Sequence, residues 1–197
     1  NGISKPVVKF LVIGGNGRVG GATAKFLHLL TTRPKDEPEL EFGDDGYEVN
    51  LVLGGRSEEN FRQSKARILS QLAEEAKMTS SLVPPPKITF QCLDFDGESS
   101  SAVASVEESF NACGADVIIH TAGPFQQRRD PVVLEAAIRC GLPYVDVCDE
   151  VDLCKAGKLL QREAEEAGTV ALVAGGIWPG VSALMAAEGA ELALSNK

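Results

Sequence analysis

Residues 7–20 read VVKFLVIGGNGRVG, an almost unbroken apolar run followed by a turn rich in glycine. The run Val7–Ile13 has the length and composition of a β-strand that is buried on both faces. A helical pattern of apolar and polar residues begins directly after the turn and covers Arg18–Leu30. This order of strand, tight turn and helix predicts the first unit of a dinucleotide-binding α/β domain.

Within the turn, Gly15, Gly17 and Gly20 satisfy the spacing G-x-G-x-x-G. We expect Gly15 to permit the turn, Gly17 to let the backbone approach a pyrophosphate, and Gly20 to let the helix pack closely on the strand. The free N–H groups and the positive dipole end of the helix would then hold the phosphates. Glycine turns are common, so the position after the first apolar strand is what makes this motif specific.

The rest of the chain alternates between apolar runs of strand length and amphipathic stretches of helix length. Further strands are expected at Glu48–Leu53, Lys87–Leu93, Asp116–Thr121, Tyr144–Val147 and Thr169–Ala174. Further helices are expected at Glu58–Lys77, Ser99–Ala112, Pro131–Cys140 and Val151–Ala167, with Pro131 in a first turn and Asp130 as its N-cap. Six strands with intervening helices predict an α/β fold, a Rossmann-type doubly wound parallel sheet.

The end of the second strand indicates which dinucleotide is preferred. NAD-preferring domains usually carry Asp or Glu there, which binds the ribose 2′-hydroxyl. This chain has Gly55, Arg56 and Ser57 instead. Arg56 can make a planar, charged contact with a 2′-phosphate, and Ser57 can add a hydroxyl donor. These residues favour NADP(H) over NAD(H), and the alternative is that Arg56 is an ordinary surface charge.

Two other strand ends carry candidate cofactor contacts. Asp94 follows the third strand, where its carboxylate can reach an adenine amino group. The fourth strand leads into Thr121, Ala122, Gly123, Pro124 and Phe125, whose small residues and rigid Gly-Pro turn suit close passage of a ribose or nicotinamide. His120 precedes this turn and is a catalytic candidate, but its place at the buried end of a strand favours a packed, hydrogen-bonded histidine.

The amino-acid composition argues against several classes of partner and site. The 197 residues carry a formal charge of −9, from 19 basic and 28 acidic residues, whereas nucleic-acid and anionic-membrane partners require basic patches. The five cysteines show no CxxC spacing and the two histidines lie far from any paired cysteines, so no metal site is expected. With no signal peptide and no long apolar run, we expect a soluble intracellular protein with reduced thiols, with no transmembrane segment and not secreted.

Several stretches together resemble the saccharopine dehydrogenase family, in particular its saccharopine dehydrogenase-like NADP-binding domain. They are LVIGGNGRVGGATAKFL, VLGGRS, DVIIHTAGPFQ, PVVLEAAIRCGLPYVDVCDE and ALVAGGIWPGVSALMAAE, and they cover nearly the whole chain. The resemblance implies that the dinucleotide lies over Gly15, Asn16, Gly17, Arg18 and Val19. It also implies that Gly55, Arg56 and Ser57 face the adenosine phosphate and that residues 121–125 line the nicotinamide side. Family members occur in plants, algae and bacteria, so the cytoplasm or the plastid stroma is the expected location.

The resemblance also implies a domain organisation. Residues 1–177 would form the NAD(P)-binding domain, and residues 178–197 would form a turn and helix leading toward a second, substrate-binding domain that is lacking here. The expected function is therefore that of an NADP(H)-binding oxidoreductase domain. Hydride would pass to or from a carbonyl or imine held by the missing domain, and the catalytic residues are not assigned.

Two other functions are compatible with a nucleotide-binding fold. One is a non-catalytic nucleotide-binding subunit, structural or redox-sensing, in a larger assembly, because no convincing acid–base group is evident. The other is a short-chain dehydrogenase, which needs a Tyr-x-x-x-Lys pair; Tyr47 and Tyr144 are followed four residues later by Leu51 and Cys148, which rejects it. The apolar residues of Val181–Leu194 predict contact with a partner subunit or a second copy of the chain.

Overall fold

A computed structural model describes residues 6–32, 48–79, 84–96, 99–123 and 129–195. Its sheet consists of six strands in the order β3-β2-β1-β4-β5-β6, all paired in parallel. The strands are β1 Val7–Ile13, β2 Glu48–Gly55, β3 Lys87–Cys92, β4 Val117–His120, β5 Tyr144–Asp146 and β6 Ala171–Leu172. This topology confirms the predicted Rossmann-type doubly wound sheet.

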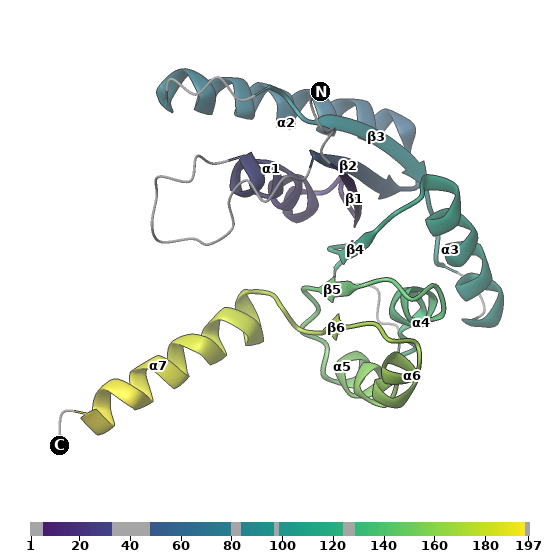
Figure 1. Ribbon diagram of the computed structural model, residues 1–197, viewed down its shortest axis with the longest axis vertical. Helices are drawn as coiled ribbons and strands as arrows, with labels where there is room; N and C mark the ends of the chain where they lie inside the picture. Colours follow the sequence, from purple (N-terminus) through teal and green to yellow (C-terminus); the bar gives the residue numbers. More distant parts are fainter. Residues whose placement is uncertain (1–5, 33–47, 80–83, 97–98, 124–128, 196–197) are drawn as a thin grey trace.

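Helices cover both faces of the sheet (Figure 1). One face packs against α1 Arg18–Thr32 and α2 Glu58–Thr79, and the other against α3 Ser99–Cys113 and α4 Val132–Arg139, with α5 Val151–Lys158 and α6 Gln161–Glu166 beside them. The central strand β1 shows why its sequence is almost wholly apolar. Leu11 and Ile13 belong to the core under α3 and α4, whereas Val12 between them belongs to the core under α1 and α2.

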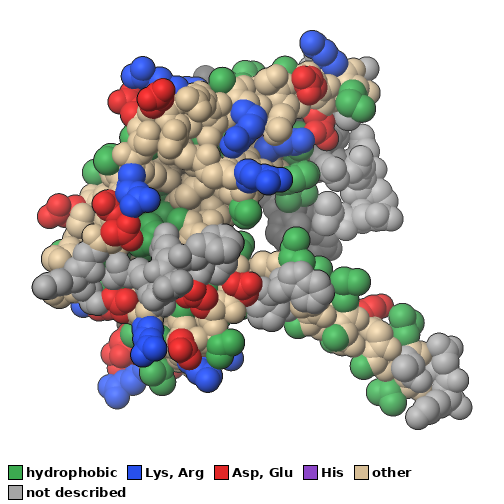
Figure 2. Space-filling model, turned by 180° about the vertical axis from the view of Figure 1, so that it is seen from behind, with side chains coloured by type: hydrophobic (Ala, Val, Ile, Leu, Met, Phe, Trp, Pro, Cys, Tyr) green, Lys and Arg blue, Asp and Glu red, His purple; other side chains and the backbone are tan. Residues whose placement is uncertain are grey.

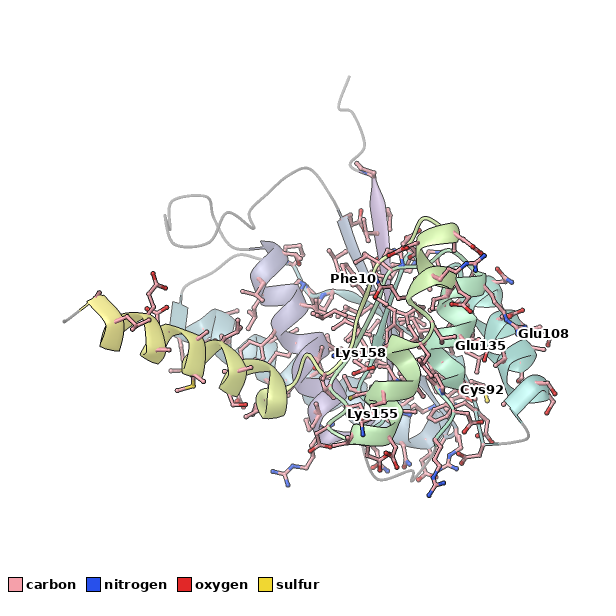
Figure 3. All side chains as sticks on the ribbon, turned by 90° about the horizontal axis from the view of Figure 1, so that it is seen from below. Phe10, Cys92, Glu108, Glu135, Lys155 and Lys158 are labelled. Atoms are coloured by element: carbon pink, nitrogen blue, oxygen red, sulfur yellow. The ribbon has the colours of Figure 1, made fainter. Side chains whose placement is uncertain are left out.

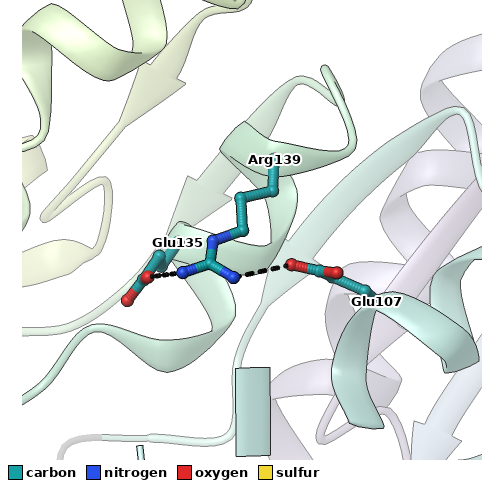
Figure 4. A network of polar contacts seen from close by, with 3 residues as sticks. All are labelled: Glu107, Glu135 and Arg139. Atoms are coloured by element: carbon teal, nitrogen blue, oxygen red, sulfur yellow. Dashed lines mark hydrogen bonds and ion pairs between the residues drawn. The ribbon is translucent and has the colours of Figure 1, made fainter. Parts of the chain in front are cut away.

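The outer surfaces of the helices are polar and contribute less to stability. Arg139 of α4 pairs with Glu135 one turn earlier and reaches Glu107 of α3 at 3.5 Å, which links two neighbouring helices (Figure 4). Lys155 and Lys158 lie exposed on α5 (Figure 3). Exposed ion pairs of this kind stabilise a fold by about 1 kcal/mol or less each, so the two apolar cores carry most of the stability.

The last predicted strand is shorter than expected. Residues 169–174 were expected to be extended, but β6 contains only Ala171 and Leu172. Ala174 adopts a positive φ of 59°, and its N–H donates to Asp146 Oδ1 at 2.8 Å. The backbone therefore leaves the ladder because a buried carboxylate at the end of the neighbouring strand binds its amide.

Two helix boundaries also differ from the prediction. The expected helix Val151–Ala167 is divided into α5 and α6, because the N–H groups of Leu159 and Leu160 bond the carbonyls three residues earlier. Pro131 occupies the N-cap of α4 rather than its first turn, without a side-chain cap, so the assignment of the cap to Asp130 was wrong. The Asp130 carbonyl instead accepts the N–H of Val132 at 2.9 Å.

The C-terminal elements project from the body of the domain (Figure 1). A π-helical turn, Ile177–Val181, leads into α7 Ser182–Ser195, along which hydrophobic side chains are exposed (Figure 2). Leu184 and Met185 are 73% and 70% exposed. The predicted apolar surface is therefore present, while its partner stays a prediction. No helix among the described residues is long and apolar enough to cross a membrane.

Candidate functional site

The glycine turn lies at the carboxyl end of β1, in the middle of the sheet. The positive φ of this turn, 77°, belongs to Gly14, which precedes the first glycine of the motif, Gly15. Gly15 is required for a different reason, because a Cβ there would lie 2.8 Å from the Val12 carbonyl and from a methyl of Leu53. The turn therefore packs closely against Leu53 of the neighbouring strand β2.

Gly20 holds the start of α1 against the turn, as predicted. A Cβ on Gly20 would lie 2.4 Å from the Gly14 carbonyl oxygen and 2.6 Å from Thr121 Oγ1. Thr121, which follows β4, connects that strand end to β1, because its Oγ1 donates to the Ile13 carbonyl at 2.7 Å. Gly17 is exposed and its backbone is accessible, but its contact with a pyrophosphate stays a prediction.

The turn offers a set of backbone donors. The N–H groups of Asn16, Arg18, Val19 and Gly20 have no hydrogen-bond acceptor among the described residues. The first turn of α1 contains no acidic residue that would repel an anion. Free amide groups at the N-terminus of a 15-residue helix form an anion-binding position.

Two carbonyl groups of the same turn accept hydrogen bonds from side chains of α2. Ser64 Oγ donates to the Asn16 carbonyl at 2.7 Å, and Arg67 Nη2 donates to the Gly17 carbonyl at 3.2 Å. These contacts fix the peptide planes and leave the amide groups for a ligand. Neither residue was predicted, because both lie on a helix about 50 residues further along the chain without a motif of their own.

Asn16 connects the glycine turn to the end of β2. Its Nδ2 donates to the Ser57 carbonyl at 3.2 Å, and a Cβ on Gly55 would lie 2.7 Å from that nitrogen. Gly55 is therefore needed for the close approach of Asn16. The Oδ1 atom of Asn16 is buried and has no partner among the described residues.

Arg56 and Ser57 lie at the carboxyl end of β2, as predicted. The guanidinium of Arg56 is 70% exposed and pairs with Asp96 at 2.7 Å. Ser57 Oγ accepts the N–H of Asn60 at 3.2 Å and so caps α2. Asp96 was not predicted; Asp94, the predicted adenine contact, is exposed, and its Oδ1 accepts the Asp96 N–H at 3.0 Å. Asp94 thereby shapes the turn that presents Asp96 to Arg56.

The turn after β4 lies beside the glycine turn. A Cβ on Gly14 would be 2.6 Å from the Ala122 nitrogen, so the backbones of the two turns are in contact. Thr121, Ala122 and Gly123 are thus at the same sheet edge as Gly15, Gly17 and Arg18. Pro124 and Phe125 were also predicted to line the nicotinamide side and lie outside the described residues.

Behind this turn, a chain of hydrogen bonds connects three buried or half-buried side chains. His120 Nδ1 lies 3.0 Å from the Tyr144 hydroxyl, which donates to Asp146 Oδ2 at 3.0 Å. Asp146 Oδ1 accepts the N–H groups of Cys148 at 3.1 Å and Ala174 at 2.8 Å. His120 is therefore a packed, hydrogen-bonded histidine, as favoured from the sequence. Tyr144 and Asp146 were predicted only as strand residues.

Burial controls the ionisation of this chain. Desolvation lowers the pKa of His120 from its ordinary value of 6.5 to about 4, although a backbone hydrogen bond at Ala122 opposes the shift. Desolvation and the negative charge of Asp146 raise the pKa of Tyr144 well above its usual range. At neutral pH the imidazole is therefore uncharged and the phenol keeps its proton.

This ionisation predicts a pH dependence of stability. The unfolded chain takes up a proton at His120 near pH 6.5, whereas the folded chain does so only near pH 4. The stability associated with neutral His120 is thus present above pH 6.5, is lost as the pH falls toward 4, and amounts to about 3 kcal/mol. Urea unfolding between pH 7 and pH 4 should show a steeper loss for wild type than for His120→Gln. Equal slopes in the two proteins would contradict the shift, since His28, whose pKa burial also lowers, is common to both.

Among the described residues, no group of three His, Cys, Asp or Glu side chains is placed to hold a metal ion. The groups that do converge are a turn of free amides and an arginine, at the ends of β1 and β2. This donor set fits a dinucleotide, because it offers N–H groups to phosphates and polar side chains to sugar hydroxyls.

Comparison with known proteins establishes the fold class. No protein-family model and no curated protein matches this sequence, so the family resemblance stays a prediction. A short-chain dehydrogenase from Oenococcus oeni PSU-1 is similar in structure, with a TM-score of 0.52 and 12% identity over 88% of this chain and 81% of that chain. An alcohol dehydrogenase from the archaeon Thermococcus sibiricus, complexed with 5-hydroxy-NADP, gives a TM-score of 0.46 and 14% identity over 84% of this chain and 74% of that chain. The likeness to the Oenococcus protein supports the Rossmann-type fold.

Proposed function

We propose that this chain is the NADP(H)-binding domain of a saccharopine dehydrogenase-like oxidoreductase, acting on a carbonyl or imine held by a second domain. The observation that carries the proposal is the group of unpartnered N–H donors at residues 16 and 18–20, at the end of the central strand of a Rossmann-type sheet. When bound, the dinucleotide would supply the hydride chemistry. The residues of this chain would bind and orient it.

Each part of the turn has a defined task in this proposal. The amides of Arg18 and Val19 would hold the pyrophosphate, while Ser64 and Arg67 keep the turn rigid through its carbonyls. Ala122 and Gly123 would line the nicotinamide side, because their backbone adjoins the glycine turn.

The preference for NADP(H) is proposed from Arg56. Its guanidinium is exposed at the end of β2, and the strand itself ends in Gly55 without a carboxylate. Asp96 holds the guanidinium over this strand end through an exposed ion pair, which is weak enough to be replaced by a 2′-phosphate. A phosphate accepts two parallel N–H bonds from arginine, so the exchange favours the ligand.

Arg56→Ala should weaken NADPH binding by about 1.5–3 kcal/mol, the usual contribution of a hydrogen bond to a charged group. NADH affinity should change less than twofold, because NADH has no 2′-phosphate. Calorimetric titration of both ligands measures the two effects. The matched control is Asp96→Asn, which releases Arg56 from its ion pair and should leave NADPH affinity unchanged or raise it. An equal loss for both ligands in Arg56→Ala would contradict the role of this residue.

Cys148 and Cys154 give no support to the alternative of a redox-sensing subunit. Cys148 is buried, and desolvation raises its pKa to about 11. Desolvation also raises the pKa of Cys154, whose thiol lies 3.7 Å from the Cys148 carbonyl. Thiols with raised pKa values hold little thiolate at neutral pH and react slowly with oxidants.

A further inference from the structure

Arg67 of α2 lies against the carbonyl side of the glycine turn. Its Nη2 donates to the Gly17 carbonyl at 3.2 Å and to Ser64 Oγ at 3.4 Å. Ser64 Oγ in turn donates to the Asn16 carbonyl at 2.7 Å. The Gly17 carbonyl also accepts the N–H of Gly21, in the first turn of α1, at 3.0 Å. Two donors, one of them charged, therefore converge on one peptide oxygen.

The same peptide group carries a candidate phosphate donor. The carbonyl of Gly17 and the N–H of Arg18 belong to one peptide unit, and that N–H has no acceptor among the described residues. A hydrogen bond at the oxygen of a peptide draws electron density from its nitrogen, which makes the N–H a stronger donor. Hydrogen bonds from a charged donor are about twice as strong as those between neutral groups. The guanidinium therefore polarises this unit more than a backbone amide would.

Arg67 forms no ion pair with any carboxylate among the described residues. Its polar contacts within that part of the chain are the Gly17 carbonyl and Ser64 Oγ, neither of which carries a charge. Arg56, by contrast, pairs with Asp96 at 2.7 Å. The field of the Arg67 guanidinium favours an anion at the free amides of the turn, and it acts on a phosphate there whether or not the ligand also has a 2′-phosphate.

Gly21 leaves room for the guanidinium beside the first turn of α1. A Cβ at this position would lie 3.0 Å from Arg67 Nη2 and 3.7 Å from the Gly15 carbonyl oxygen. Only the end of a flexible side chain would have to move for this Cβ, by a few tenths of an ångström. Glycine at this position therefore permits the contact between Arg67 and the turn, whereas the fold itself would accept alanine.

We propose that Arg67 is a positioning residue of the dinucleotide site, which strengthens the Arg18 amide as a phosphate donor by polarising the peptide between Gly17 and Arg18. This role rests on the proposed function, in which that amide binds the pyrophosphate. Arg67 thereby differs from Arg56, whose proposed contact is the 2′-phosphate of NADPH alone. The pyrophosphate is common to NADPH and NADH, so Arg67 supports the binding of both ligands equally.

Calorimetric titration of Arg67→Met tests this role, because methionine keeps an unbranched side chain and removes the charged donor. The affinities for NADPH and NADH should both fall by about threefold to tenfold, the range expected for one charge that acts through a peptide near the solvated surface. The loss should shrink as the ionic strength rises, because salt screens an exposed charge. A loss independent of salt would show that Arg67 only holds the turn in place, and would overturn the proposal.

Arg162→Met is the matched control for Arg67→Met. It removes one positive charge from α6, where Arg162 is exposed and pairs with Glu166. Both dinucleotide affinities should stay at the wild-type value in this control. A loss confined to NADPH in Arg67→Met, or no loss for either ligand, would contradict a role at the pyrophosphate.

Gly21→Ala tests the same contact from the side of α1. The added Cβ displaces the guanidinium, so dinucleotide affinity should fall, but by less than in Arg67→Met. The protein should not lose stability, because alanine favours a helix. In the Arg67→Met background the same substitution should leave affinity unchanged, since the contact is already absent. Additive losses in the double variant would contradict the proposed contact.

The amide signal of Arg18 in nitrogen-15 NMR tests the polarisation without any dinucleotide. A hydrogen bond at the Gly17 carbonyl deshields the nitrogen of the same peptide, so this signal should move upfield in Arg67→Met and stay in place in Arg162→Met. An unchanged signal in Arg67→Met would overturn the proposal, even if dinucleotide affinity falls. If the expected shift is found and the wild-type protein binds neither NADPH nor NADH, the polarised peptide is confirmed and the proposed function is contradicted.

Discussion

Replacing Gly20 with alanine is expected to lower the free energy of unfolding by about 3 kcal/mol, at the upper end of the usual cost of overpacking. The added Cβ would lie 2.4 Å from the Gly14 carbonyl oxygen, a backbone atom that cannot rotate away. The start of α1 must therefore move off the turn. Because the same movement displaces the amides of Arg18 and Val19, dinucleotide affinity should fall more than tenfold. Urea unfolding and calorimetric titration measure the two losses.

Gly189→Ala is the matched control for this substitution. Gly189 lies within α7, and a Cβ there would meet nothing within 4 Å. Alanine in an exposed helix interior should raise stability by about 0.5–1 kcal/mol relative to glycine. If Gly20→Ala proves as stable as Gly189→Ala, the close contact between α1 and the turn is not present in the folded protein.

Asp146→Ala is expected to be at least as damaging, with a loss of about 3 kcal/mol or more. The carboxylate accepts three hydrogen bonds, from the Tyr144 hydroxyl and from the N–H groups of Cys148 and Ala174. Each buried donor left without its acceptor costs about 1–3 kcal/mol. The substitution should also release Ala174 from its positive φ, since the bond to Asp146 holds that residue outside the β6 ladder. Urea unfolding at pH 7 measures the loss.

Two further variants separate charge from hydrogen bonding at this position. Asp146→Asn keeps an oxygen for the two backbone amides, so its loss should be smaller than that of alanine. Asp149→Ala removes an exposed carboxylate three residues further on and should change stability little. We therefore expect Asp149→Ala to be the most stable of the three variants, Asp146→Asn to be intermediate, and Asp146→Ala to be the least stable. Equal stability of the first and the last would contradict the buried network.

The fold was predictable because its strongest signals are local. The VVKFLVI run is apolar because β1 is covered on both faces, and the glycine spacing follows from the need to pack α1 against the turn. The strand β6 was not predictable in the same way. The length of β6 depends on the Asp146 carboxylate, which lies 28 residues before Ala174 and accepts a hydrogen bond from the Ala174 N–H. No periodicity within residues 169–174 encodes that long-range bond.

In the candidate site, too, the residues that belong to local motifs were predicted and those that depend on tertiary contacts were not. Residues at the ends of β1, β2 and β4 were predicted because ligands of doubly wound sheets bind at carboxyl strand ends. The motif spacing alone could not show that Gly14, which precedes the motif, takes a positive φ and lies against Ala122. Ser64, Asp96 and Tyr144 were missed because their partners lie 24 to 48 residues away along the chain. Such contacts are tertiary and leave no local pattern.

The central claim is that this chain holds an NADP(H)-binding site, and calorimetric titration of the wild-type protein with NADPH and with NADH tests it most directly. The account predicts one NADPH per chain, bound at least about tenfold more tightly than NADH, the equivalent of one hydrogen bond to a charged group. Tighter binding of NADH would contradict the role of Arg56 while keeping the dinucleotide site. Absence of binding by either ligand would contradict the site itself.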